Sequence, residues 1–243
     1  MVMVYCEGPT EWYVIRKLNE YNVLKGDLID KDNVDIHIVN SPKKITRDFI
    51  LKCPLKWNKF LLIYDQENYS SPRDFADNEF NHLSPWFHIS DNENILYTNI
   101  ENKLVYLHVN VSPSPNGYKD FDGYLKELIT RMGHQLVQLI MSNNNLIPSY
   151  IRELANSNNI FADIHQMGVD EIPNLMDDKK FTIQRSKGHL YAYIAASQIS
   201  KSHVWFAEKI VEIILKNGFL DQVNVVFNSL IEAWNRLVGV QST

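Results

Sequence analysis

The fold is decided near the N-terminus, by the stretch VMVYCEGPTEW at residues 2–12. Its apolar half closes on Glu7, and the residues that follow, Gly8-Pro9-Thr10, are typical of a turn or of the first residues of a helix. The stretch therefore predicts a strand, a tight turn and a helix start, with Glu11 in the first helical turn. Open α/β sheets carry their sites at the carboxyl ends of strands, so Glu7 and Glu11 are candidate site residues.

A second apolar run, KFLLIY at residues 59–64, closes on Asp65-Gln66-Glu67. If this strand lies beside the first, Asp65 and Glu67 converge with Glu7 and Glu11 on one edge of the sheet. Four carboxylates stay ionised at close range only with a cation between them. Clustered carboxylates without a Cys or His ligand set favour a hard cation, so we expect Mg²⁺ or Mn²⁺ at this edge.

Strand and helix patterns alternate along the first part of the chain. The predicted order is a strand up to Cys6, a helix at about 9–21, a strand at 34–39, a helix at 45–53 and a strand at 59–65. This alternation is typical of a mostly parallel sheet with crossover helices. Residues 72–83 are expected to form either a helix or an ordered loop, and two further strands are expected at 94–99 and 103–110.

From about Gly133 onward the sequence predicts helices separated by short turns. They cover residues 135–141, 149–156, a stretch ending near 178, 188–199, 203–215 and 223–237. We therefore expect an α/β domain at residues 1–132, and a helical C-terminal region at residues 133–243 that packs on it.

Length and composition limit the kinds of protein that this chain can be. The chain has 243 residues with 45% hydrophobic residues, enough for a sizeable core. No apolar run approaches the roughly 18–20 residues that span a bilayer, so no membrane attachment is expected. Cys6 and Cys53 form no CxxC pair or disulfide framework, which favours a reducing, cytoplasmic setting. The formal net charge of −5 opposes broad attachment to a polyanion, but a local basic face or bound divalent ions leave nucleic acid open as a partner.

Several common site motifs are absent from the sequence. The eight histidines include no HxxxH or HxH pair, so a zinc hydrolase is not supported. The chain also has no GxGxxG and no GxxxxGK[ST], so a glycine loop for nucleotide phosphates is not supported.

Two further groups of charged residues have alternative interpretations. Asp120 and Asp122 follow a Pro- and Ser-rich loop and open a helix that reaches about Met132, where acidic residues favour the helix dipole but also suit a site. Arg185 and Lys187 stand at the start of a later helix, either as a phosphate-binding site or as a solvated basic turn.

The two acidic motifs resemble those of the TOPRIM fold, which is shared by topoisomerases, bacterial primases, small ribonucleases and the OLD-family nucleases. The resemblance rests on Glu7-Gly8-x-Thr10-Glu11 after the first strand and on Asp65-x-Glu67 after a later one. It covers roughly residues 1–130. The segments at 119–125 and 186–190 look like features of small stand-alone TOPRIM relatives, a weaker likeness.

The resemblance implies roles for particular residues. Glu7 matches the family's glutamate, which acts as general acid or base or binds metal near the scissile phosphate. Asp65 and Glu67 match the Asp-x-Asp metal ligands, with Glu in place of the second Asp. Glu11 matches a further metal ligand of OLD-like nucleases. The acidic residue and the lysine that those enzymes use later in the chain have their candidates in Asp120, Asp122 and Lys187.

Three functions from different classes follow. The first is a Mg²⁺-dependent nuclease that hydrolyses DNA or RNA at the acidic cluster. The second is a non-catalytic TOPRIM-like module that acts with a partner protein such as an ATPase. The third is a receiver-like phosphoacceptor domain, which usually has adjacent acidic residues after its first strand, whereas Glu7 and Glu11 are four residues apart. Nothing resembles the extra domains of a topoisomerase or a primase.

Overall fold

The computed structural model describes residues 1–24, 33–89, 92–113, 118–143, 147, 149–178, 186–199 and 201–239. The chain divides into two compact units. The sheet unit comprises Met1–Val111, Lys119–Phe121 and Phe227–Thr243, and the helical unit comprises Ser112–Tyr118 and Asp122–Val226.

The sheet unit is built on a six-stranded, mostly parallel sheet, which confirms the predicted α/β class. The strands lie in the order β2-β1-β3-β6-β5-β4. Only β5 has the opposite direction, so it pairs antiparallel with β6 and with β4, and the other pairs are parallel. Their bounds are β1 Val2–Cys6, β2 Val34–Ile38, β3 Lys59–Asp65, β4 Phe87–Ile89, β5 Asn92–Ile100 and β6 Lys103–Asn110.

The central strands are buried on both faces, which explains their continuous apolar runs. Every residue of β1 is buried, as are Phe60–Tyr64 of β3. The parallel register pairs Cys6 with Ile63, and Asp65 with Asn110. The carboxyl ends of β1, β3 and β6 therefore meet at one edge of the sheet.

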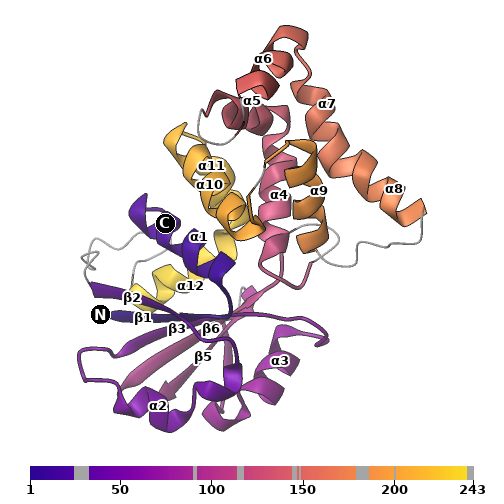
Figure 1. Cartoon of the computed structure of the whole chain (residues 1–243). Coiled ribbons are helices and arrows are strands. Elements are labelled where there is room, and N and C mark those ends of the chain that lie inside the picture. The colour runs from indigo at the N-terminus through magenta and orange to yellow at the C-terminus, as the bar shows by residue number, and fades with distance from the viewer. Residues whose placement is uncertain are drawn as a thin grey trace. The chain divides into compact units, whose positions relative to one another are not determined.

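Helices cover both faces of this sheet (Figure 1). On one face lie α2 (Arg47–Lys52) and α3 (Pro72–Glu79), and on the other lie α1 (Pro9–Glu20) and α12 (Asn228–Val238). Side-chain caps define where the first two begin. Thr46 Oγ1 accepts from Phe49 N at 3.1 Å, and Ser71 Oγ accepts from Asp74 N at 3.0 Å. Residues 72–79 thus form a helix, one of the two alternatives for that segment.

The edge where the strands begin holds a buried cation. Lys103, the first residue of β6, is 2% exposed. Its Nζ donates to the carbonyl oxygens of Cys53, Pro54 and Trp57, at 2.9, 3.1 and 2.7 Å. The lysine therefore fastens the connection between α2 and β3 to the sheet.

Two short 3-10 helices, η2 Pro42–Lys44 and η3 Asn81–Leu83, also belong to the sheet unit. The helical unit contains the other helices (Figure 1). They are α4 Asp122–Met132, α5 His134–Ser142, α6 Ser149–Asn158, α7 Phe161–Gln166, the π-helix η4 Met167–Glu171, α8 Ile172–Asp178, α9 Ser186–Ala196, α10 His203–Lys216 and α11 Leu220–Val226. Gly168 allows η4 to pack against α9, because a Cβ there would lie 2.7 Å from Cδ2 of Tyr193. Across the described part of the chain, no helix is long and apolar enough to cross a membrane.

One observed strand was not predicted, and one predicted helix is divided in two. The three-residue strand β4 was not expected, since it is too short to give a clear alternation. The single helix expected at 223–237 is two helices, α11 and α12, separated at Phe227. Phe227 is fully buried and lies 5.9 Å from Phe121, ring centre to ring centre, within the sheet unit.

The two units also differ from the expected division at residue 132. Residues 122–132 belong to the helical unit, and the C-terminal helix α12 belongs to the sheet unit. The physical reason is that α12 packs on β3, β5 and β6, and Lys59 Nζ of β3 donates to the carbonyl of Val238 at 3.2 Å.

Candidate functional site

Glu7 and Asp65 lie side by side at the carboxyl ends of β1 and β3. The backbone N–H of Glu7 continues the parallel ladder by donating to the carbonyl of Ile63 at 3.1 Å. The Glu7 side chain then turns to β3, and its Oε2 accepts from the backbone N–H of Asp65 at 3.0 Å. The strand register therefore places the carboxylate of Glu7 next to Asp65.

Asp65 is held by two further donors. Its Oδ1 accepts from Asn110 Nδ2 at 2.8 Å and from the backbone N–H of Phe121 at 2.9 Å. Asn110 is the last residue of β6 and is fully buried. The Asp65 carboxylate is therefore positioned by the neighbouring strand and by the short segment Lys119–Phe121.

A buried polar chain extends from Asn110 into the core. His108 Nδ1 lies 3.2 Å from Asn110 Oδ1, and His108 Nε2 lies 2.9 Å from Ser229 Oγ on α12. Because the amide oxygen of Asn110 can only accept, Nδ1 of His108 carries the proton in this arrangement. Burial lowers the pKa of His108 to about 4, so the imidazole is neutral near pH 7.

The electrostatics of the site disfavour ionised carboxylates. Burial and the charge of Glu11 hold the pKa of Asp65 well above its ordinary value of 3.8, with smaller contributions from Glu7 and Asp120, while the Asn110 hydrogen bond opposes the shift. Burial also raises the pKa of Glu7 above 4.5, against the stabilising N–H of Asp65. These carboxylates lie close enough to repel one another.

Glu11 lies in the first turn of α1 and is 5% exposed. A Cβ on Gly8 would lie 3.0 Å from Glu11 Oε2, so the absence of a side chain at Gly8 makes room for this carboxylate. A glutamate at this place in a helix commonly caps the N-terminus. The position of Glu11 therefore suits two roles, capping the N-terminus of α1 and the predicted metal binding.

Glu67 and Asp120 stand at the rim of the same edge. Glu67 is exposed in the turn after β3 with φ of 49°, its N–H donates to the carbonyl of Lys119 at 3.0 Å, and its charge raises the pKa of Glu7. Asp120 adds to the raised pKa of Asp65. Five of the predicted site residues therefore interact electrostatically within the sheet unit.

The remaining predicted residues do not belong to the sheet unit. Asp122 is the first residue of α4, and Lys187 is an exposed residue of α9, so both belong to the helical unit. Burial lowers the pKa of His203 and the nearby charge of Lys187 lowers it further. Arg185 lies outside the described residues. The roles of these three residues stay predictions.

No protein-family model, curated protein or solved structure matches this chain. The site is therefore interpreted from its own geometry and chemistry.

The carboxylates fit a hard divalent cation in ligand chemistry. Within the described ranges, no three Asp, Glu, His or Cys side chains are arranged to hold a metal ion. Mg²⁺ needs fewer, because it is usually bound through one or two carboxylates and keeps several waters. Among the described residues, Oε1 of Glu7 and Oδ2 of Asp65 take part in no hydrogen bond, so each carboxylate retains an oxygen for a cation.

Sequence reasoning did not identify three groups that shape the site, namely Asn110, the backbone N–H of Phe121 and the backbone carbonyl of Lys119. A signal existed for Asn110, which ends a predicted strand as Asp65 does. No side-chain pattern marks the two backbone groups, because every residue type except proline carries both.

Proposed function

We propose that this protein is a Mg²⁺- or Mn²⁺-dependent nuclease that hydrolyses phosphodiester bonds of DNA or RNA at the carboxyl ends of β1 and β3. We also propose that the sheet and its two acidic motifs correspond to those of the TOPRIM fold. The proposal also includes a cytoplasmic setting, in keeping with the two free cysteines, Cys6 and Cys53.

One observation carries the proposal: Glu7 Oε2 accepts from the backbone N–H of Asp65 at 3.0 Å, across two adjacent parallel strands. This bond orients one oxygen of Glu7 and leaves the other to face a ligand. Ligand sites of open α/β sheets lie outside the carboxyl ends of their strands, where this pair stands.

In the proposed site, Glu7 and Asp65 would hold the divalent ion, and Glu11, Glu67 and Asp120 are further candidate ligands or charges around it. When bound there, the ion would polarise the scissile phosphate and lower the pKa of an attacking water. Asn110 and the N–H of Phe121 keep the carboxylate of Asp65 in one orientation. The raised pKa of Glu7 suits a group that exchanges a proton closer to neutral pH.

The test is calorimetric titration of Mg²⁺ and Mn²⁺ into the wild type and into Asp65→Asn, with cleavage of single- and double-stranded DNA and RNA measured in parallel. Asparagine retains an oxygen that can accept from Asn110 and Phe121, but it removes the charge. We expect metal binding to be lost and cleavage to fall by at least about 10³-fold, since metal ligation supplies several kcal/mol of transition-state stabilisation.

Asp48→Asn is the matched control, because Asp48 is an exposed residue of α2. It should bind metal and cleave as the wild type does. Wild-type protein that binds metal but cleaves none of the substrates would favour the alternative, a non-catalytic module that acts with a partner protein such as an ATPase. Absence of metal binding would reject the nuclease proposal.

A further inference from the structure

A cavity of about 360 Å³ lies in the sheet unit between the start of α3 and the hairpin of β4 and β5. Ligand pockets generally measure about 300–1,000 Å³, so this one suits a single small group. Its lining combines apolar surface with three charged or titratable side chains. Among the described residues, the cavity is lined by Ser71, Pro72, Arg73, His88, Ile89 and Glu93.

The cavity lies at the same edge of the sheet as the carboxylates. Residues 66–71 lead from Asp65, at the end of β3, directly to Pro72 of α3. The antiparallel pairing of Ile95 with His108 places the start of β5 beside the end of β6, where Asn110 contacts Asp65. The cavity and the carboxylates therefore lie along the same edge of the sheet, with β6 between them.

Two hydrogen bonds orient Arg73 at one side of the cavity. Its Nε donates to Asp77 Oδ2 at 2.7 Å, and its Nη1 donates to the carbonyl of Trp86 at 2.6 Å. A guanidinium has five N–H donors in a fixed plane, so these bonds orient the group and leave donors for a ligand. Its positive charge is already balanced by Asp77.

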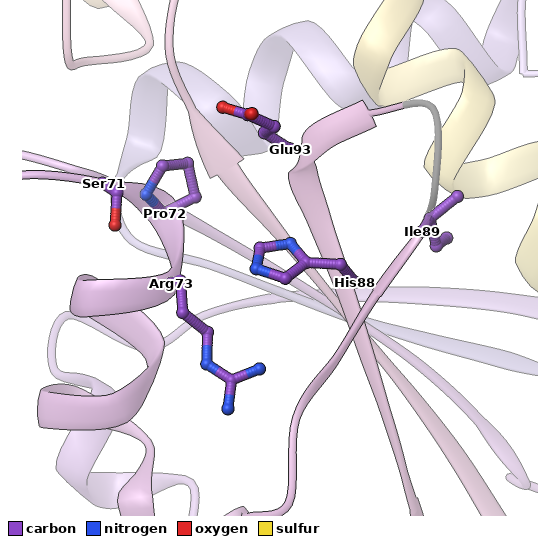
Figure 2. Close-up of a pocket in the computed structure, with 6 residues that line it drawn as sticks. All are labelled: Ser71, Pro72, Arg73, His88, Ile89 and Glu93. Atoms are coloured by element: carbon purple, nitrogen blue, oxygen red, sulfur yellow. The ribbon is translucent and has the colours of Figure 1, made fainter.

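Figure 2 shows that the imidazole of His88 points from β4 toward α3, with Glu93 on one side of it and Arg73 on the other. His88 is exposed, whereas Pro72 and Ile89 are buried and supply apolar wall. The cavity thus offers a flat ring for stacking, a carboxylate that accepts and a guanidinium that donates.

This combination favours a nucleobase over a phosphate. Among the described residues, the carboxylates of Glu93 and Asp77 outnumber the guanidinium of Arg73, so a phosphate dianion would be repelled. Unstacked bases of single strands are recognised by stacking on flat side chains, histidine included, and by hydrogen bonds at their edges. Arginine pairs with the O6 and N7 acceptors of guanine, and a carboxylate accepts from the N–H donors of its neighbouring edge.

We propose that this cavity binds an unstacked nucleobase, preferably guanine, next to the carboxylate site. Glu93 and Arg73 determine the base, and His88 provides the stacking surface. The identification of the base as part of a nucleic acid substrate rests on the proposed nuclease function, whereas the binding of the base itself does not.

The test is an NMR or calorimetric titration of the wild type with the 5′-monophosphates of guanosine, adenosine, cytidine and uridine, and with inorganic phosphate. The guanosine nucleotide should bind at least about tenfold more tightly than the others, which is the discrimination expected of one good base-edge contact. Inorganic phosphate should not bind. Absence of nucleotide binding, or equal binding of all four, would overturn the proposal.

Three variants separate the roles. Glu93→Gln should remove the guanine preference, and Arg73→Gln should do the same, although it also loses contacts that hold α3. His88→Ala should weaken all four nucleotides by about tenfold, since stacking does not distinguish bases. Glu101→Gln is the charge-matched control at the opposite end of β5, and it should behave as the wild type. Retention of the preference in Glu93→Gln would contradict the assignment.

A short single-stranded oligonucleotide with one guanine tests whether the bound base belongs to a strand. It should compete with the mononucleotide, and Mg²⁺-dependent cleavage should map to a fixed position relative to the guanine. Guanine binding without any cleavage would retain the base site and reject the nuclease. Cleavage without base preference would retain the nuclease and reject the base site.

Discussion

Charged side chains lie at both ends of the strands, and the two groups differ in how well hydrogen bonds satisfy them. At the edge where the strands begin, Lys103 is 2% exposed and donates to three carbonyl oxygens. At the edge where β1 and β3 end, two carboxylates lie together, and the pKa of each is raised.

The difference lies in how many hydrogen-bond partners compensate each charged group for the loss of water. An ammonium group has three N–H donors, and the three carbonyls satisfy all of them. A carboxylate accepts about four hydrogen bonds, whereas Asp65 receives two N–H donors on one oxygen and Glu7 receives one. A compensated buried charge holds the fold together, while a charge that the fold tolerates without full compensation is typical of a functional site.

The largest effect on the free energy of unfolding should come from removing the ammonium group of Lys103. Lys103→Met leaves three inward-facing carbonyls without their donor, so the free energy of unfolding should fall by about 3–5 kcal/mol. Urea denaturation followed by tryptophan fluorescence measures the change. Lys52→Met, at an exposed position of α2, should stay within about 0.5 kcal/mol of the wild type. A Lys103→Met protein as stable as the wild type would show that these carbonyls rehydrate without loss.

A smaller effect should appear in acid through the polar chain behind Asp65. His108 is neutral in the fold, with a pKa lowered from 6.5 to about 4, so its contribution to stability is present above pH 6.5 and is lost as the pH falls toward 4. Between these values the wild type should lose about 3 kcal/mol from this group.

His108→Gln should lose less stability than the wild type between pH 7 and pH 4, by about that amount, when both are measured by urea denaturation at each pH. His134→Gln, at an exposed position of α5, is the control and should keep the wild-type pH dependence. Identical pH profiles for the wild type and His108→Gln would indicate that His108 is accessible to water.

The smallest effect, of opposite sign to Lys103→Met, should come from Asp65→Asn. The fold favours the protonated carboxyl, so the ionised form lowers stability above its raised pKa. Without metal at pH 8, Asp65→Asn should be more stable than the wild type by on the order of 1 kcal/mol.

Thermal unfolding across pH checks this. The difference should shrink as the pH falls below 3.8, where the carboxyl is protonated in the folded and unfolded chains. Added Mg²⁺ should stabilise the wild type alone, because only a state that binds the ion gains by mass action. If Asp65→Asn is less stable than the wild type at pH 8, the ionised carboxylate of Asp65 stabilises the fold, as the ammonium group of Lys103 does.

Much of the sheet was predictable because its signals are local. The apolar runs that end at Cys6, Asp65 and Asn110 gave the three central strands, and a further strand was expected at 94–99, within β5. The antiparallel pairing of β5 with β6 was not predicted. The strand β4 and the break at Phe227 were not predicted, because a three-residue strand has almost no periodicity and the break depends on burial of one ring in the sheet unit.

The sequence by itself determined the mostly parallel sheet and the presence of Glu7 and Asp65 at strand ends, because both follow from the period and the limits of apolar runs. Only the tertiary structure decided which groups hold Asp65, that α12 packs on the sheet, and that Lys103 is buried against carbonyls. These facts depend on contacts between segments far apart in the chain, and backbone N–H and carbonyl groups take part in them regardless of residue type.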